Sequence, residues 1–239
     1  MAAQQCGPGD VHVWMISPAP PLPAACDSWA ILSAHERSRA ERFHFEADRQ
    51  WYVARHYAVR SILSGYVDAA PSELVFGYGE AGKPELTYPP GSGIRQNLSH
   101  ASSLAVLAVT RDEPVGVDIE RKRPVPEACD IARRMFSEGE YRLIAAASGA
   151  ARDEAFLRCW TCKEAVVKAT GQGITAPLQS FDVGAAMGGA IATIHLEGDG
   201  ENPWVIASLA VGPEHIGAVV RRGTLGRVEM CTWGPEGTR

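Results

Sequence analysis

The stretch D-E-A-F-L-R-C-W-T-C-K-E-A-V-V-K-A-T-G-Q-G, residues 153–173, carries the strongest single pattern in this sequence. It predicts a helix with Asp153 as its N-cap and with Gly171 and Gly173 as stop signals. Because successive helical residues are rotated by about 100°, the apolar residues of this stretch fall on one face. This apolar stripe contains Phe156, Cys159, Trp160, Val166 and Val167. The pattern therefore predicts a helix that packs one face against a core.

Three charged residues accompany the apolar stripe. Lys163 falls within it, while Glu164 and Lys168 lie along its edge. Charges beside a buried seam must be paired, solvated by a cleft, or bound to an ion or ligand. Because Glu164 and Lys168 share the i,i+4 spacing, they also fit an ordinary surface ion pair worth roughly a few tenths of a kcal/mol. The helix alone leaves both interpretations open.

Length and composition indicate a soluble globular protein of one large domain or two smaller ones. The chain has 239 residues, of which 46% are hydrophobic and 21% are charged, as in ordinary globular proteins. We expect a cytoplasmic protein without a membrane span, because no signal peptide and no sufficiently long apolar run is present. The net charge of −5 and the lack of a basic run argue against nucleic-acid binding.

The six cysteines lack the spacing of a small disulfide scaffold, so we expect reduced thiols. Cys159 and Cys162 form a C-x-x-C pattern. Redox pairs of this kind normally begin a helix after a strand, whereas these two fall in the middle of one. No second pair completes a zinc site. We therefore interpret both as small core side chains.

The N-terminal part predicts one strand and two helices. Val11–Ile16 alternates as an edge strand does. Ser33 and Glu36 have the spacing of a capping box and predict the start of a first helix, which carries Arg39. A second helix is expected from about residue 47 to residue 64. Its predicted buried face consists of Trp51, Ala54, Ala58 and Ile62, and its surface carries Arg49, Arg55, His56 and Arg60. Most of these arginines are expected to be solvated, but Arg55 lies close to the apolar face.

A short strand at residues 74–78 is followed by the turn G-E-A-G-K-P-E-L at residues 79–86. Pro84 favours an extended backbone at Lys83, which would present the ammonium outward. The polar segment N-L-S-H, residues 97–100, then precedes a buried strand over residues 104–110.

Asp118 and Glu120 lie in the next predicted strand, V-G-V-D-I-E, residues 115–120. Alternate residues of a strand share a face, so the two carboxylates project together. They repel unless a cation or a proton lies between them, and hard oxygen ligands suit Mg²⁺. A strand end that emerges into solvent explains the same pattern.

The remainder predicts further helices and strands. A helix ends near Phe136, and Ser137 with Glu140 forms a second capping box. Strands are expected at residues 190–196, 204–211, 216–221 and 227–233. The segment R-F-H-F-E-A-D-R-Q-W-Y before one long helix echoes R-M-F-S-E-G-E-Y-R-L-I before another, which indicates two similar α+β halves joined near residues 111–116.

The chain carries, in this order, the motifs G-K-P (82–84), N-L-S-H (97–100), G-V-D-I-E (116–120), F-S-E-G-E (136–140) and W-T-C-K-E-A-V-V-K-A-T-G-Q-G (160–173). This ordered set resembles the Sfp-type 4′-phosphopantetheinyl transferases. The resemblance implies an α+β monomer whose halves, residues 1–112 and 113–239, are related by a pseudo-twofold axis. Coenzyme A would bind in the cleft between them. The implied reaction transfers phosphopantetheine from coenzyme A to a serine of an apo acyl or peptidyl carrier protein and releases 3′,5′-ADP.

The resemblance also implies roles for individual residues. Asp118, Glu120 and Glu164 would hold Mg²⁺ or Mn²⁺ at the coenzyme A pyrophosphate. Lys168 would contact phosphate oxygens, and Glu164 resembles the family's proposed general base. The expected coenzyme A contacts are Lys83, Asn97, Ser99, His100, Arg39, Arg55, Lys163 and Lys168.

Carrier proteins are commonly acidic, so a docking face should be apolar or basic. Residues 121–123 and 135–136 are the candidates for that face. The alternatives are a non-catalytic module of the same fold that binds carrier proteins or coenzyme A, and a structural protein whose charges form ordinary ion pairs.

Overall fold

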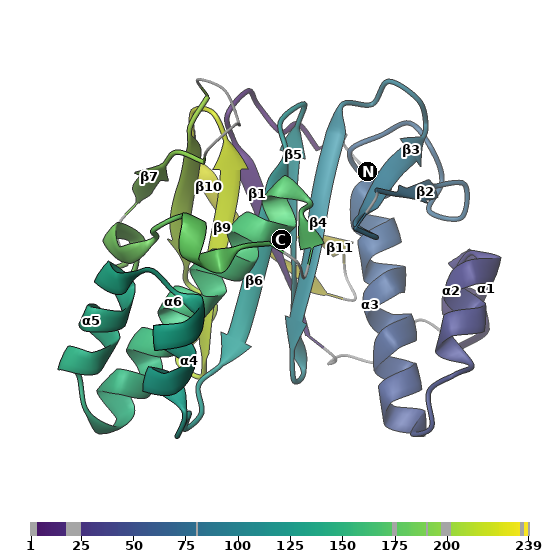
Figure 1. The fold of residues 1–239 in the computed structure, drawn as a ribbon. Coiled ribbons are helices and arrows are strands. Elements are labelled where there is room, and N and C mark those ends of the chain that lie inside the picture. Colours follow the sequence, from purple (N-terminus) through teal and green to yellow (C-terminus); the bar gives the residue numbers. More distant parts are fainter. Residues whose placement is uncertain are drawn as a thin grey trace.

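Helices flank a central layer of strands in this α+β protein (Figure 1). The computed structural model describes residues 4–17, 25–79, 81–173, 176–189, 191–196, 202–234 and 237–238. The α-helices are α1 (Ala25–Ile31), α2 (Ala34–Ala40), α3 (Glu46–Ser64), α4 (Ala128–Met135), α5 (Glu138–Ala146) and α6 (Gly149–Thr170). The strands are β1 (Val11–Ile16), β2 (Val75–Tyr78), β3 (Pro84–Tyr88), β4 (Ile94–Ala101), β5 (Leu104–Arg111), β6 (Val115–Arg121), β7 (Ala192–Ile194), β8 (Trp204–Leu209), β9 (His215–Arg222), β10 (Val228–Gly234) and β11 (Gly237–Thr238).

Within the described residues the strands form three sheets. The first has the order β11-β10-β1-β5-β4, the second has the order β6-β9-β8-β7, and β2 pairs with β3 as a hairpin. The four strands predicted after α6 are present as β7 to β10, although residue 190 and residues 197–201 lie outside the described part. β10 pairs in parallel with β1, so the end of the chain returns to the sheet that contains its beginning.

The prediction that Val11–Ile16 is an edge strand is wrong, because β1 pairs on both sides, with β10 and with β5. Val11 and Val13 pack in one core cluster with Val117 of the second sheet, and Trp14 packs in another with Ile62 of α3. Apolar residues therefore cover both faces of β1, which a pattern of alternation does not indicate.

Helix α3 is buried from two directions, which changes the face predicted for it. Ala58 and Ile62 are buried against the first sheet, as expected. Tyr52 and Val53 are also buried, because they pack with Ala40 of α2 on the opposite side. The expected residues Trp51 and Ala54 are only half-buried.

Arg60 of α3 is buried and paired, and is not one of the solvated arginines predicted for this helix. Its guanidinium donates to the Glu36 carboxylate at 2.8 Å and to the carbonyls of Pro71 and Leu74 at 2.9 Å each. Glu36 also closes the predicted capping box of α2, because its carboxylate accepts from the Ser33 N–H. Burial alone would raise the pKa of Glu36, but hydrogen bonds from His56, Arg60 and Ser33 lower it to about 2.

This depressed pKa predicts sensitivity to acid. Below its ordinary pKa of 4.5, Glu36 takes up a proton in the unfolded chain before it does so in the folded one. The free energy of unfolding should therefore fall by about 3 kcal/mol between pH 4.5 and pH 2 through this group. Urea unfolding at several pH values tests this against Glu36→Gln. The variant should be less stable at pH 7 and should match the wild type near pH 2, and an equal deficit at both pH values would contradict the assignment.

Helix α6 is longer than predicted at its N-terminus and ends where predicted. It begins after Ser148, and Asp153 lies inside it, where its carboxylate accepts from the Val125 N–H at 3.2 Å. Gly171 has φ 73° and is the left-handed C-cap that the sequence indicates. No helix in the described part of the chain is long and apolar enough to span a membrane.

Gly116 of β6 allows α6 to lie directly on the strand. A Cβ atom at this position would overlap the backbone of Ala165 and Ala169 in α6. Gly116→Ala should therefore push α6 away from β6 and cost about 2–3 kcal/mol of unfolding free energy. Gly188→Ala is the matched control, since a Cβ there meets no heavy atom within 4 Å. Equal unfolding midpoints for the two variants would show that the close approach is not required.

Candidate active site

A pocket of about 950 Å³ lies among the turn at residues 81–84, strands β4 and β6, and helix α6. It brings together eight of the residues predicted for the site, namely Lys83, Asn97, Ser99, His100, Asp118, Glu120, Glu164 and Lys168. The pocket has the size of a cofactor site. It carries carboxylates from β6 and α6 together with the ammonium groups of Lys83 and Lys168, so it suits a ligand that presents phosphate and a cation together.

The two larger sheets meet at this pocket through side chains of β4. Asn97 Oδ1 accepts a hydrogen bond from Val117 N at 2.9 Å, and Ser99 Oγ accepts one from Ile119 N at 3.4 Å. β6 pairs with β9 on its other side, so these two side chains satisfy N–H groups along its second edge. The predicted nucleotide-binding residues Asn97 and Ser99 thus also hold β6 in register beside β4.

Asp118 is the most enclosed of the three predicted metal ligands, with an exposure of 5%. Its Oδ1 accepts from Ser99 Oγ at 2.8 Å and from Lys168 Nζ at 2.6 Å. Burial raises the pKa of Asp118, while Lys168 and Ser99 act in the opposite direction. Its Oδ2 is buried and has no partner among the described residues. A buried carboxylate oxygen without a partner, on a residue that lines a pocket, fits a ligand for a cation.

Glu120 and Glu164 face the same pocket as Asp118. Burial is the main cause that raises the pKa of each, and the negative charge of Asp118 raises both further. As they stand, no three His, Cys, Asp or Glu side chains of the described residues form a ready metal site. The three carboxylates nevertheless repel one another across one pocket, and a divalent cation between them would relieve that repulsion. We conclude that their chemistry fits a hard cation.

His100 lines the pocket and is neutral near pH 7. Although its side chain is exposed on the pocket wall, partial burial and then the charges of Arg55 and Lys168 lower its pKa to about 4. Arg55 lies over the Tyr52 ring at 5.1 Å, and its buried Nε has no partner among the described residues. Arg55 is therefore close enough to influence His100, but it does not line the pocket.

Arg39 lies apart from this pocket. It lines a smaller cavity of about 370 Å³ together with His35, Ser38, Arg42 and Phe43. The structure therefore does not bring Arg39 to the carboxylates, and a role for it depends on a ligand that reaches this second cavity.

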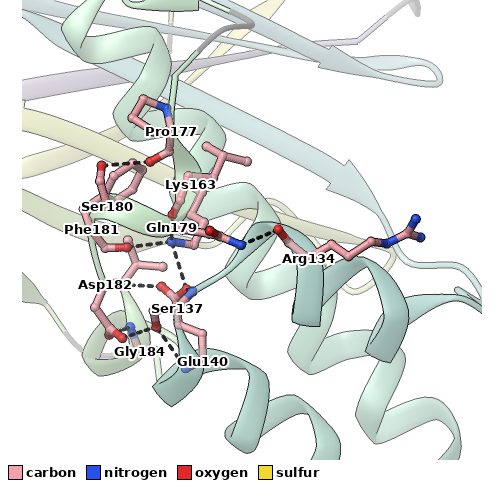
Figure 2. A network of polar contacts seen from close by, with 12 residues as sticks. Arg134, Ser137, Glu140, Lys163, Pro177, Gln179, Ser180, Phe181, Asp182 and Gly184 are labelled. Carbon is pink, nitrogen blue, oxygen red and sulfur yellow. Dashed lines mark hydrogen bonds and ion pairs between the residues drawn. The ribbon is translucent and has the colours of Figure 1, made fainter.

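Lys163 does not face the pocket, so the prediction that it contacts phosphate is wrong. Its fully buried ammonium is 2.9 Å from Glu140, whose side chain is also fully buried. It donates in addition to the carbonyls of Leu178 and Phe181 at 2.7 Å each. Figure 2 shows Lys163 between Phe181 and Glu140. Glu140 accepts from Val183 N at 2.7 Å. The capping-box pattern identified Glu140 as the residue that bonds back to the N-cap Ser137. No local pattern identified Glu140 as the partner of Lys163.

Lys83 is not presented outward as predicted. Its ammonium turns back to the carbonyls of Val115 and Ala169, and burial lowers its pKa to about 8. The local backbone rule at Pro84 says nothing about these carbonyls, because they belong to distant segments.

The pocket wall also includes Arg121, Arg123, Met135 and Trp160. Met135 is 40% exposed, whereas Phe136 is 3% exposed and belongs to the core. Of these two residues predicted for the docking face, only Met135 is therefore at the surface.

Cys159 and Cys162 are free and buried in the core around α6, and burial raises the pKa of both thiols.

The fold and the pocket define an α+β protein with three carboxylates and a lysine converging on a cofactor-sized cavity. Residues 114–220 match the 4′-phosphopantetheinyl transferase superfamily, and residues 20–112 match the N-terminal family "4′-phosphopantetheinyl transferase, N-terminal". The chain belongs to the 4′-phosphopantetheinyl transferase superfamily and is an enzyme of that class.

Three curated relatives support this assignment. 4′-Phosphopantetheinyl transferase HetI of Nostoc sp. (strain PCC 7120) is 38% identical over 73% of this chain and 73% of its own length. 4′-Phosphopantetheinyl transferase Sfp of Bacillus subtilis is 30% identical over 80% of this chain and 82% of its own. 4′-Phosphopantetheinyl transferase psf-1 of Bacillus pumilus is 33% identical over 80% and 79% respectively.

Proposed function

We propose that this enzyme transfers 4′-phosphopantetheine from coenzyme A to a serine hydroxyl of an apo acyl or peptidyl carrier protein, in a reaction that needs Mg²⁺ or Mn²⁺. The observation that supports this most is the meeting of Asp118, Glu120, Glu164 and Lys168 in one pocket. In the reaction the serine oxygen bonds to the phosphorus on the pantetheine side of the pyrophosphate. The bond from that phosphorus to the bridging oxygen breaks, and 3′,5′-ADP leaves.

The three carboxylates are the proposed metal ligands. Asp118 is held in place by Ser99 and Lys168, and its free Oδ2 is available to a cation. When bound, the ion would neutralise charge on the pyrophosphate. Glu164, whose pKa is raised by burial and by Asp118, is the proposed acceptor of the serine proton.

Apart from Lys83 and Lys163, the remaining predicted residues are proposed to hold the nucleotide part of coenzyme A. Lys168 contacts phosphate oxygens, for which its side chain, 29% exposed, is accessible at the pocket. Asn97, Ser99 and His100 form the wall opposite α6. Arg55 and Arg39 assist binding electrostatically, Arg55 through its proximity to His100 and Arg39 from the neighbouring cavity.

A carrier protein is proposed to dock at the pocket rim formed by Arg121, Arg123, Met135 and Trp160, where an acidic and apolar surface finds complementary groups. We further propose that the enzyme is a cytoplasmic monomer with halves at residues 1–112 and 113–239 and the active site between them. The return of β10 to the first sheet means that the second half also contributes a strand beside β1.

The test is the intact mass of a carrier protein after incubation with this enzyme, Mg²⁺ and coenzyme A. The expected result is the added mass of one phosphopantetheine group on the carrier serine, and no addition when EDTA replaces Mg²⁺ or when that serine is alanine. Carriers from fatty-acid, polyketide and nonribosomal-peptide systems should be tried in parallel. An unmodified mass for all of them would contradict the proposed function.

A further inference from the structure

Lys83 connects three segments that are far apart in the sequence. Its Nζ donates to the Val115 carbonyl at 2.9 Å and to the Ala169 carbonyl at 3.2 Å. Val115 begins β6, and Ala169 lies in the last turn of α6. The last carbonyls of a helix lack intrahelical partners and carry partial negative charge, so a lysine ammonium satisfies them well.

Two further observations place the turn at residues 81–84 tightly between its neighbours. Gly173, just past the C-cap of α6, has φ 69°, and a Cβ atom there would lie 2.7 Å from the Cβ of Ala81. On the other side, Gln96 Nε2 of β4 donates to the Pro84 carbonyl at 3.0 Å. The turn is therefore fixed between β4 and the end of α6, and all three line the pocket or support its wall.

We propose that Lys83 is a positioning residue, which docks the turn at residues 81–84 onto the end of α6 and so sets the width of the pocket there. It acts through the two carbonyls and not through contact with the 3′-phosphate of coenzyme A. The docking itself follows from the contacts above, and only the identity of the ligand rests on the proposed function.

Hydrogen exchange of the ligand-free enzyme tests the docking. Lys83→Met keeps the length of the side chain and removes its donors, so amides of residues 81–83, 85–88 and 171–173 should exchange about tenfold faster or more. Gly173→Ala should have the same effect by a different route, since its Cβ collides with Ala81. Arg142→Met on the exposed face of α5 is the control and should leave these amides unchanged. Wild-type exchange of these segments in Lys83→Met would overturn the proposal.

Binding of two ligands separates positioning from direct contact. Coenzyme A and 3′-dephospho-coenzyme A should both lose about tenfold in affinity for Lys83→Met, because the pocket wall moves for both. The KM for coenzyme A should rise while kcat changes less. A loss confined to coenzyme A would show that Lys83 contacts the 3′-phosphate and would refute the positioning role. Should the wild type bind neither ligand, the proposed function would fail while the exchange experiment would still decide the role of Lys83.

Discussion

Asp118→Asn is expected to lower kcat at least about a hundredfold at saturating coenzyme A and Mg²⁺. The substitution keeps the size of the side chain but removes the charge that pairs with Lys168 at 2.6 Å and replaces one of the two carboxylate oxygens, of which the buried Oδ2 has no partner among the described residues. An amide nitrogen is no ligand for a hard cation, and Lys168 loses its counter-ion at the same time. The variant should therefore fold normally and fail in the chemical step.

The control for this experiment is Asp48→Asn on the exposed surface of α3, which should turn over like the wild type. Steady-state rates measured across a Mg²⁺ titration distinguish the causes. Weakened metal binding shows as a higher Mg²⁺ requirement, whereas a loss of Lys168 alignment persists at any concentration. A kcat within about threefold of the wild type at moderate Mg²⁺ would remove Asp118 from the mechanism.

Lys163→Met should be the most destabilising single change, with a loss of about 3–5 kcal/mol in the free energy of unfolding. It leaves Glu140 as a fully buried charge without its partner. It also removes the donor for the Leu178 carbonyl and for the Phe181 carbonyl (Figure 2), which anchor the segment after α6. The loss reflects an unpaired buried charge and not the net contribution of the pair.

The double variant Glu140→Gln with Lys163→Met tests that explanation. Neutralising Glu140 should recover part of the loss, which urea unfolding measured for the two single variants and the double variant can resolve. Lys122→Met is the matched control, because Lys122 and Glu154 form an exposed pair at 3.5 Å, and the expected change is below about 0.5 kcal/mol. A loss of similar size for Lys122→Met and Lys163→Met would contradict the distinction.

Features that depend on neighbours in the sequence were predictable. Both capping boxes, at Ser33 and Ser137, are present with both of their hydrogen bonds, and Gly171 ends α6 in the left-handed conformation. The shared face of Asp118 and Glu120 follows from strand alternation alone. The helical spacing of apolar residues likewise identified α6 as a core helix with charges at the edge of its apolar stripe.

Features that depend on distant segments were not predictable from local pattern. β1 was predicted to be an edge strand from its alternation, and β10, which pairs with it from more than 200 residues later, gives no local sign of that pairing. Lys163 and Lys83 were both predicted to contact coenzyme A, yet each is directed to carbonyls or a carboxylate of another segment. The ordered set of motifs identified the residues of the pocket. Only the fold could distinguish Lys168, whose ammonium contacts Asp118 at the pocket, from Lys163, which is buried on Glu140.

The most direct test of the account is the binding of Mn²⁺, followed by electron paramagnetic resonance, in the presence of coenzyme A. The wild type should bind one ion per chain. Asp118→Asn, Glu120→Gln and Glu164→Gln should each weaken that binding at least about tenfold, because each removes one charged oxygen ligand. If the triple variant bound Mn²⁺ as tightly as the wild type, the three carboxylates would not be the metal site.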